Sequence, residues 1–171
     1  MGLESINFGA ALTKAGVPTS GVFQVETGTV IGTVSGAGNA AVVLTAAGMT
    51  GSPITLAVPV ANLDTATQVA VKIRAALSAN AVIAAFFTIG GTVADVQLTR
   101  TVSAANDATL NLSIDNGTCT GLTTAASSSN TTSGVLGDYH GVAGGQVVIN
   151  TSSQTIYQNT GDQYRPVWTL Q

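Results

Sequence analysis

Apolar and polar residues alternate along several short stretches of the chain, as they do in strands with one buried face. The clearest stretch is 54–60, where Ile, Leu and Val occupy the even positions and Thr55, Ala57 and Pro59 the odd ones. Because Pro59 has no N–H to donate, the end of this strand is predicted at a sheet edge or a bulge. Residues 109–114 alternate in the same way, with Leu110, Leu112 and Ile114 on one face.

Further strands are predicted at 22–34, 41–45 and 92–102, separated by clusters of Gly, Ser, Asn and Asp typical of turns. In the first of these, Phe23, Val25 and Thr27 alternate with Gln24 and Glu26.

One amphipathic helix is predicted at 65–77. Thr65 and Gln68 have the spacing of a capping box. Apolar residues then recur at three- and four-residue steps and form a single stripe of Ala66, Val69, Ala70, Ile73, Ala76 and Leu77. A short second helical turn at 81–87 is expected to place Val82, Ile83 and Phe86 beneath the sheet.

The order of these elements predicts an α+β, β-dominated fold, in which one main helix covers an antiparallel sheet and a small C-terminal β-meander follows. Four segments are expected. They are an N-terminal arm at 1–20, an α+β core domain at 21–116, a Gly/Ser/Thr-rich linker or long loop at 117–137, and the β-meander at 138–171. The meander is too small to stand alone, so it must lie on the core domain, on another copy, or on a host protein.

Composition restricts the possible partners. Apolar residues make up 45% of the 171 residues and charged residues only 8%, about a third of the share in typical soluble domains. A surface with so few charged residues is typical of a protein packed against copies of itself or a partner. A neutral monomer is the alternative. The five basic residues are scattered and the net charge is −3, so nucleic acid is not an expected partner. No stretch approaches the ~20 apolar residues of a membrane-spanning helix.

Candidate chemistry is sparse. His140 is the only histidine, with Asp138 nearby, but no motif supplies a nucleophile. Asp115 and Asn116 offer two oxygen ligands for calcium, too few for a site. The single cysteine, Cys119, is interpreted as a small buried hydrophobe. We therefore expect no enzyme activity, no catalytic or metal-binding residues and no cofactor. Residues 1–16 lack the features of a secretory signal, so folding in the cytoplasm is expected.

Two segments carry a resemblance to known proteins. GTVSGAGNAAVVLTAAGMTGSP at 32–53, continuing through the helix to ANDATL at 105–110, resembles a module recurrent in tailed-phage structural proteins. GQVVINTSSQTIYQNTG at 145–161 is similar to short β-modules of phage head-decoration and fibre-type proteins. Together they cover most of the chain beyond residue 21. The resemblance implies a virion component, assembled in the host cytoplasm, and carries over no functional residues.

The leading hypothesis is a capsid decoration (cement) protein, a homotrimer that docks on the major capsid protein or other virion subunits. The arm and the meander are expected to form the interface. Its residues would be Leu3, Ile6, Phe8, Leu12, Ile156, Tyr157, Tyr164, Trp168 and Leu170. For Trp168, filling the meander's own small core is an equal alternative.

Two other functions compete with this hypothesis. A tail fibre, head fibre or baseplate component could bind a receptor or glycan through Tyr139, Tyr157, Tyr164 and Trp168. The chain lacks the repeats and heptads of a long fibre shaft, which favours the head. A small hydrolase would need a catalytic constellation around His140, and the sequence provides none.

Overall fold

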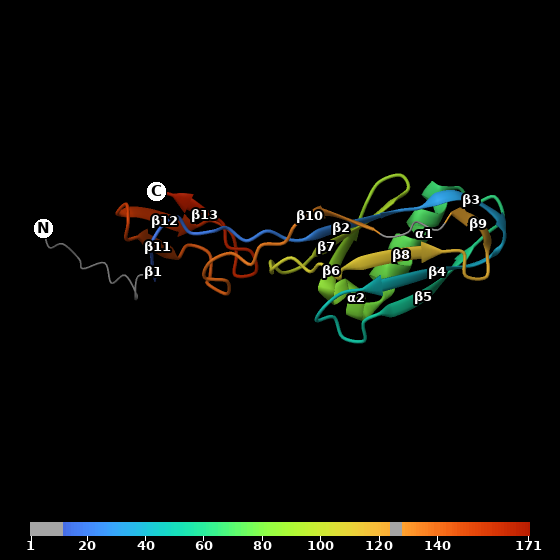
Figure 1. Ribbon diagram of the computed structural model, residues 1–171, viewed down its shortest axis with the longest axis horizontal. Helices are drawn as coiled ribbons and strands as arrows, with labels where there is room; N and C mark the ends of the chain where they lie inside the picture. Colours follow the sequence, from blue (N-terminus) through green and yellow to red (C-terminus); the bar gives the residue numbers. More distant parts are fainter. Residues whose placement is uncertain (1–11, 124–127) are drawn as a thin grey trace, which may run out of the picture. The chain divides into compact units, whose positions relative to one another are not determined.

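The computed structural model describes residues 12–123 and 128–171. Contacts divide the chain into two compact units. Figure 1 labels the helices and strands that they contain. Unit 1 combines the two ends of the chain, Met1–Val22 and Leu136–Gln171, and unit 2 is the continuous segment Phe23–Val135. Strands far outnumber helices, so the predicted β-dominated α+β class is confirmed.

Unit 2 is built from antiparallel strands in three small sheets. One has the order β10-β2-β7-β6, the second β5-β4-β8, and the third pairs β3 with β9. Pro59 lies in β5, an edge strand, as its missing N–H predicted. The strands are β2 (Val25–Thr29), β3 (Ile31–Gly36), β4 (Gly38–Thr45), β5 (Ile54–Val60), β6 (Phe87–Gly90), β7 (Asp95–Arg100), β8 (Asn111–Asp115), β9 (Thr120–Thr123) and β10 (Ser129–Thr132).

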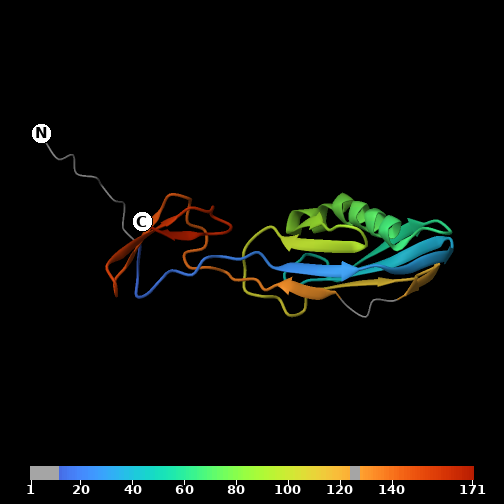
Figure 2. The ribbon, with the colours of Figure 1, turned by 90° about the horizontal axis from the view of Figure 1, so that it is seen from above.

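Two helices, α1 (Ala66–Ala79) and α2 (Ala81–Phe86), lie on one side of these strands, as Figure 2 shows. The capping box of Thr65 and Gln68 is present, and the predicted stripe is the buried face of α1. The expectation for α2 was wrong in part. Ile83 is fully buried, but Val82 is 40% exposed, because a six-residue helix can turn only one narrow face inward.

The core of unit 2 lies between α1 and the inner faces of the strands. Alternate residues of β4, β5, β7 and β8 are buried there, which confirms the alternation read from 54–60 and 109–114. Cys119 is also buried, as expected. The largest side chains with almost no exposure are Phe87, Leu44, Ile73, Leu77, Ile83, Leu98 and Leu112.

The segment 117–137 is not the predicted linker or long loop. It contains β9, which pairs with β3, and β10, which pairs with β2. Its glycines permit close approach of two backbones rather than flexibility. A Cβ on Gly121, whose φ is +97°, would lie 2.2 Å from the carbonyl oxygen of Thr33. A Cβ on Gly117 would lie 2.5 Å from the carbonyl oxygen of Asn39.

Strand β2 buries its polar face. Gln24 and Glu26 are each only 2% exposed, and they share the inward face with Gly28 and Val30. The register explains this orientation, because Glu26 lies opposite the fully buried Leu98 of β7. Gln24 is satisfied by the backbone of Asp107, donating to its carbonyl oxygen and accepting from its N–H.

Unit 1 is a four-stranded sheet in the order β1-β11-β12-β13. Part of the predicted arm is therefore a strand, β1 (Leu12–Lys14), parallel to β11 (Val147–Asn150). The predicted meander supplies β11, β12 (Thr155–Asn159) and β13 (Trp168–Leu170). The meander gains its fourth strand from the N-terminal segment because its own three strands offer too little surface to bury.

Two buried asparagines organise the loops of unit 1. Asn150 is 3% exposed and its Oδ1 accepts from the N–H groups of Gly16, Ser152 and Ser153. Asn159 is 1% exposed, and its Oδ1 accepts from the N–H groups of Gly161 and Val167. Each side-chain amide thus accepts hydrogen bonds from backbone N–H groups that lie outside the strand pairing.

The glycine constraint gives a prediction for unit 2. Gly121→Ala should lower the free energy of unfolding by at least about 2 kcal/mol more than Gly48→Ala, because only the former meets a backbone atom. Gly48 also has a positive φ, +76°, but nothing lies within 4 Å of its added Cβ. Urea unfolding followed by far-UV circular dichroism measures both. Equal losses would show that β9 does not depend on this close approach.

Candidate functional site

The residues predicted to form an interface fall into separate groups. Leu3, Ile6 and Phe8 lie outside the described residues. Leu12, Tyr157 and Leu170 are brought together, because pairing across the sheet aligns Leu12 with Val148, Val148 with Tyr157, and Tyr157 with Leu170. Residues directly opposite one another share a face, so these side chains form one row across unit 1. Leu170, at the end of the row, is 57% exposed.

Ile156 lies on the other face of the sheet. It is 46% exposed and directly opposite Ile149 of β11, which is half-buried. Two branched apolar side chains therefore stand together on the more open face. Leu170 in the edge strand β13 and Ile156, whose side chain lies on the opposite face of the sheet, are termed the apolar rim of unit 1. The rim exposes apolar surface that the unit's own fold does not cover.

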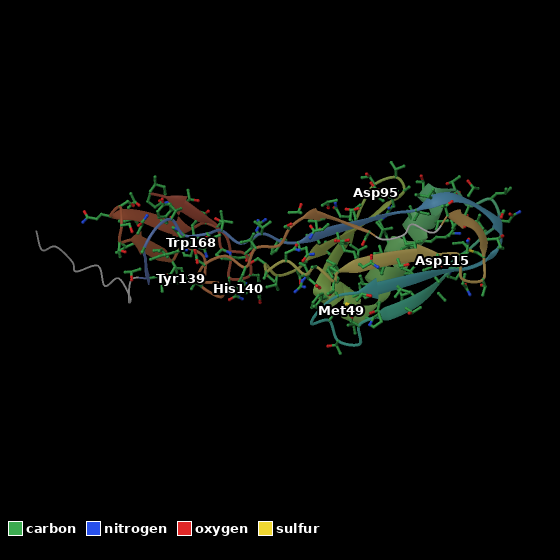
Figure 3. All side chains as sticks on the ribbon, in the orientation of Figure 1. Met49, Asp95, Asp115, Tyr139, His140 and Trp168 are labelled. Carbon is green, nitrogen blue, oxygen red and sulfur yellow. The ribbon has the colours of Figure 1, made fainter. Side chains whose placement is uncertain are left out.

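Trp168 is buried at 8% exposure and belongs to the interior of unit 1. Its indole N–H donates to the carbonyl oxygen of Asp138, and its ring packs edge-on against Tyr139 at a centroid distance of 6.0 Å. Figure 3 shows both rings in unit 1. Of the two alternatives for Trp168, the structure favours the filling of the small core.

The carboxylate of Asp138 is hydrogen-bonded to Lys14 and Thr19 of unit 1 rather than to His140. It accepts from the Lys14 ammonium and from the backbone N–H of Thr19. Burial alone would raise the pKa of Asp138, but these bonds and the charge of Lys14 outweigh it and hold the pKa below its usual value of 3.8. His140 is exposed, and within 12–123 and 128–171 its side chain makes no hydrogen bond. The carboxylate that could orient this imidazole thus has another role.

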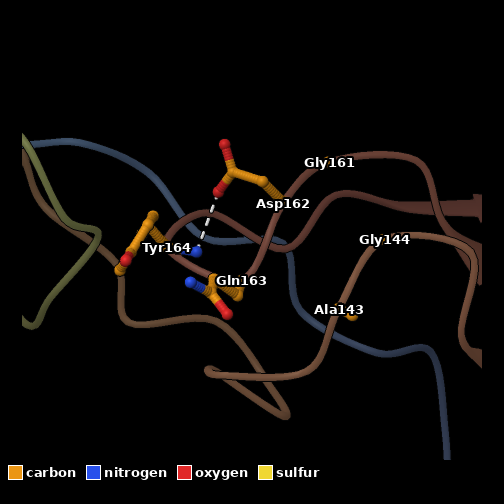
Figure 4. Close-up of a pocket in the computed structure, with 6 residues that line it drawn as sticks. All are labelled: Ala143, Gly144, Gly161, Asp162, Gln163 and Tyr164. Atoms are coloured by element: carbon orange, nitrogen blue, oxygen red, sulfur yellow. Dashed lines mark hydrogen bonds between the residues drawn. The ribbon is translucent and has the colours of Figure 1, made fainter.

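A shallow pocket of about 450 Å³ opens beside Tyr164, shown in Figure 4. It is lined by Ala143, Gly144, Gly161, Asp162, Gln163 and Tyr164. Asp162 fixes the loop, because its Oδ1 accepts from the N–H groups of Tyr164 and Arg165 at 2.8 Å. Tyr164 is 50% exposed, so the pocket presents an aromatic ring beside a carboxylate and an amide.

A second pocket lies in unit 2 and was not predicted from the sequence. It measures about 270 Å³ and is lined by Glu26, Asp107, Ala108, Thr109, Leu110, Asn111, Ser128 and Asn130. In the alternating stretch 22–34, Glu26 occupies an even position, as Gly28, Val30 and Val34 do. This spacing was the signal in the sequence that Glu26 could face inward.

Within the described ranges, no group of three or more His, Cys, Asp or Glu side chains could hold a metal ion. No helix in that part of the chain has the length and apolar character needed to cross a bilayer. Comparison with protein-family models, characterised proteins and solved structures gives no significant match.

The Lys14–Asp138 pair gives a pH-dependent prediction. Asp138→Asn should destabilise unit 1 by about 1 kcal/mol at neutral pH, a value reduced by the partial exposure of both side chains. The lowered pKa of Asp138 makes this contribution complete above the ordinary value of 3.8 and lost as the pH falls through the folded-state pKa. Trp168 is the only tryptophan, so its fluorescence during urea unfolding reports on unit 1 alone.

Lys14→Met is the matched variant and should cost about as much as Asp138→Asn. The double variant should lose no more than either single one, because both remove the same pair. Additive losses, or a difference from the wild type that does not shrink as the pH falls below 3.8, would contradict this role of the pair.

Proposed function

We propose that this chain is a structural protein of a tailed-phage particle, a decoration protein that docks on the assembled head through unit 1. The observation that carries the proposal is the apolar rim. Ile156 and Leu170 are 46% and 57% exposed on a sheet that already contains its own buried tryptophan. Large apolar side chains left outside a completed small core are typical of a surface that another protein covers.

The composition supports docking on a protein lattice. With 8% charged residues, the chain has few charges that an interface would need to pair on burial. The resemblance of 32–110 and 145–161 to phage structural modules supports the same class of partner.

The mechanism would be energetic. A protein that binds only the assembled shell stabilises that shell by linkage, as any ligand stabilises the state that it prefers. A homotrimer would add avidity, because three copies of unit 1 engage neighbouring subunits of the shell together.

The test compares binding to assembled heads of the phage that encodes the chain. Ile156→Lys with Leu170→Lys should lower the affinity on the order of 100-fold, because each change places a charge in a desolvated interface. Val71→Lys is the matched control. Val71 is 51% exposed on α1 of unit 2, and its change to Lys should leave the affinity within about twofold.

Co-sedimentation of labelled protein with purified heads gives the affinities, and Trp168 fluorescence verifies that each variant of unit 1 is folded. Absence of wild-type binding to heads, or an equal loss in Val71→Lys, would overturn docking through the apolar rim.

A glycan-binding role in a fibre or baseplate is the second candidate, and the pocket beside Tyr164 favours it. An exposed aromatic ring beside Asp162 and Gln163 offers a stacking surface together with hydrogen-bonding groups.

Tyr164→Ala should then lower oligosaccharide affinity at least about tenfold, while Tyr164→Phe, which keeps the ring, should change it less than about threefold. Saturation-transfer NMR against a panel of surface glycans is the measurement. Equal affinities in both variants would exclude stacking on Tyr164.

A further inference from the structure

The carboxylate of Glu26 is only half satisfied. The residue is 2% exposed and lines the 270 Å³ pocket of unit 2. Its Oε1 accepts a hydrogen bond of 2.5 Å from the Ser128 hydroxyl. Its Oε2 is buried and has no hydrogen-bond partner among the described residues. A buried carboxylate oxygen without a partner is costly, so this atom points to a ligand that supplies positive charge or a proton.

The side chains around the pocket provide oxygen atoms and no positive charge. Its polar side chains belong to Glu26, Asp107, Thr109, Asn111, Ser128 and Asn130, and none of the described lining residues is basic. Arg100 is the cation that acts electrostatically on Asp107, and its guanidinium lies 4.0 Å above the ring of Phe86. A positive charge at Oε2 would therefore have to come from outside this set of residues.

Two groups besides Glu26 have remaining capacity as ligands. Asp107 accepts three hydrogen bonds, from the N–H of Ala47 and from the N–H and hydroxyl of Thr109. An ionised carboxylate offers about four acceptor positions, so one is left. Asn130 donates its side-chain N–H to Asn106. The side-chain carbonyl oxygen of Asn130 is therefore left for another partner.

We propose that this pocket binds a divalent cation, with Ca²⁺ preferred, through the carboxylates of Glu26 and Asp107. The amide oxygen of Asn130 and water would complete the coordination. Two carboxylates balance the charge of the ion, and Ca²⁺ accepts the irregular oxygen geometry that Mg²⁺ does not. The site would combine two acidic residues with neutral oxygens, so it needs no third carboxylate.

The ion would have a structural role in unit 2. Glu26 lies at the centre of β2, which is paired on both sides, and Asn130 of β10 lies directly opposite it in the register. Asp107 belongs to a different segment, which is hydrogen-bonded to the Gln24 side chain. A shared ion would fasten the Asp107 segment to β2 and β10. Burial raises the pKa of Glu26, the Ser128 hydrogen bond lowers it and the charge of Asp107 raises it, with a net upward direction that a bound cation would reverse.

Thermal unfolding of the full chain, followed by far-UV circular dichroism, tests the site. About 5 mM CaCl₂ should raise the Tm of the wild type on the order of 5 °C relative to EDTA, for a Kd on the order of 0.1 to 1 mM. Glu26→Gln should show no such shift. In EDTA at neutral pH it should be at least as stable as the wild type, because the amide removes the uncompensated buried charge.

Asp95→Asn is the matched control. Asp95 also belongs to unit 2, and its Oδ1 accepts one hydrogen bond, from the Thr29 hydroxyl, but it does not line the pocket. This variant should respond to CaCl₂ as the wild type does. Isothermal titration with CaCl₂ and with MgCl₂ gives the affinities directly. Asp107→Asn, expected to weaken Ca²⁺ binding at least tenfold, carries the test if Glu26→Gln does not fold.

Three results would overturn the proposal. They are the absence of both a Tm shift and a binding heat in the wild type, an undiminished Ca²⁺ shift in Glu26→Gln, and an equal response to Mg²⁺. The inference does not depend on docking to phage heads, since the isolated chain suffices for the experiment.

Discussion

The pairing of β2 with β7 on one side and β10 on the other is the constraint on which much of unit 2 depends. This double pairing fixes the direction in which every side chain of β2 points. Val30 at one end of the inward face joins the apolar core, while Gln24 and Glu26 lie on the same face towards the other end. The fold must therefore cover two polar side chains as well as an apolar surface.

The segments that cover them are selected by hydrogen bonding. Gln24 is matched by the backbone of Asp107, and Glu26 by the hydroxyl of Ser128, which also accepts from the N–H of Leu112. Apolar residues at these two positions would give the covering segments no such preference. The unmatched Oε2 of Glu26 is the one place in this network where a partner is still required, and the cation proposal follows from it.

Unit 1 differs from unit 2 because its sheet is too small to enclose a large apolar core. It buries Asn150 and Asn159, whose side-chain amides accept hydrogen bonds from the backbone of the loops. Ile156 and Leu170 therefore do not have to fill the interior of unit 1. They are left as the apolar rim on which the docking proposal rests, while Trp168 and Tyr139 complete the interior.

The sequence by itself determined the elements whose partners are local. Periodicity and turn chemistry predict the α1 helix with its capping box and stripe, the strand at 54–60 with Pro59 at an edge, and a β-meander at 138–171. Its composition also excluded a dense surface of charge. These features depend on residues only a few positions apart, so a single sequence contains their signal.

Only the tertiary structure decided which face of β2 is buried, that the glycines of 117–137 allow close strand pairing, and that residues 12–14 complete the sheet of unit 1. Each of these depends on a partner between about 70 and 136 positions away in the chain, such as Leu98 opposite Glu26 or Val148 opposite Leu12. Alternation in a strand shows that its two faces differ but not which one meets the core, because packing against distant residues makes that choice.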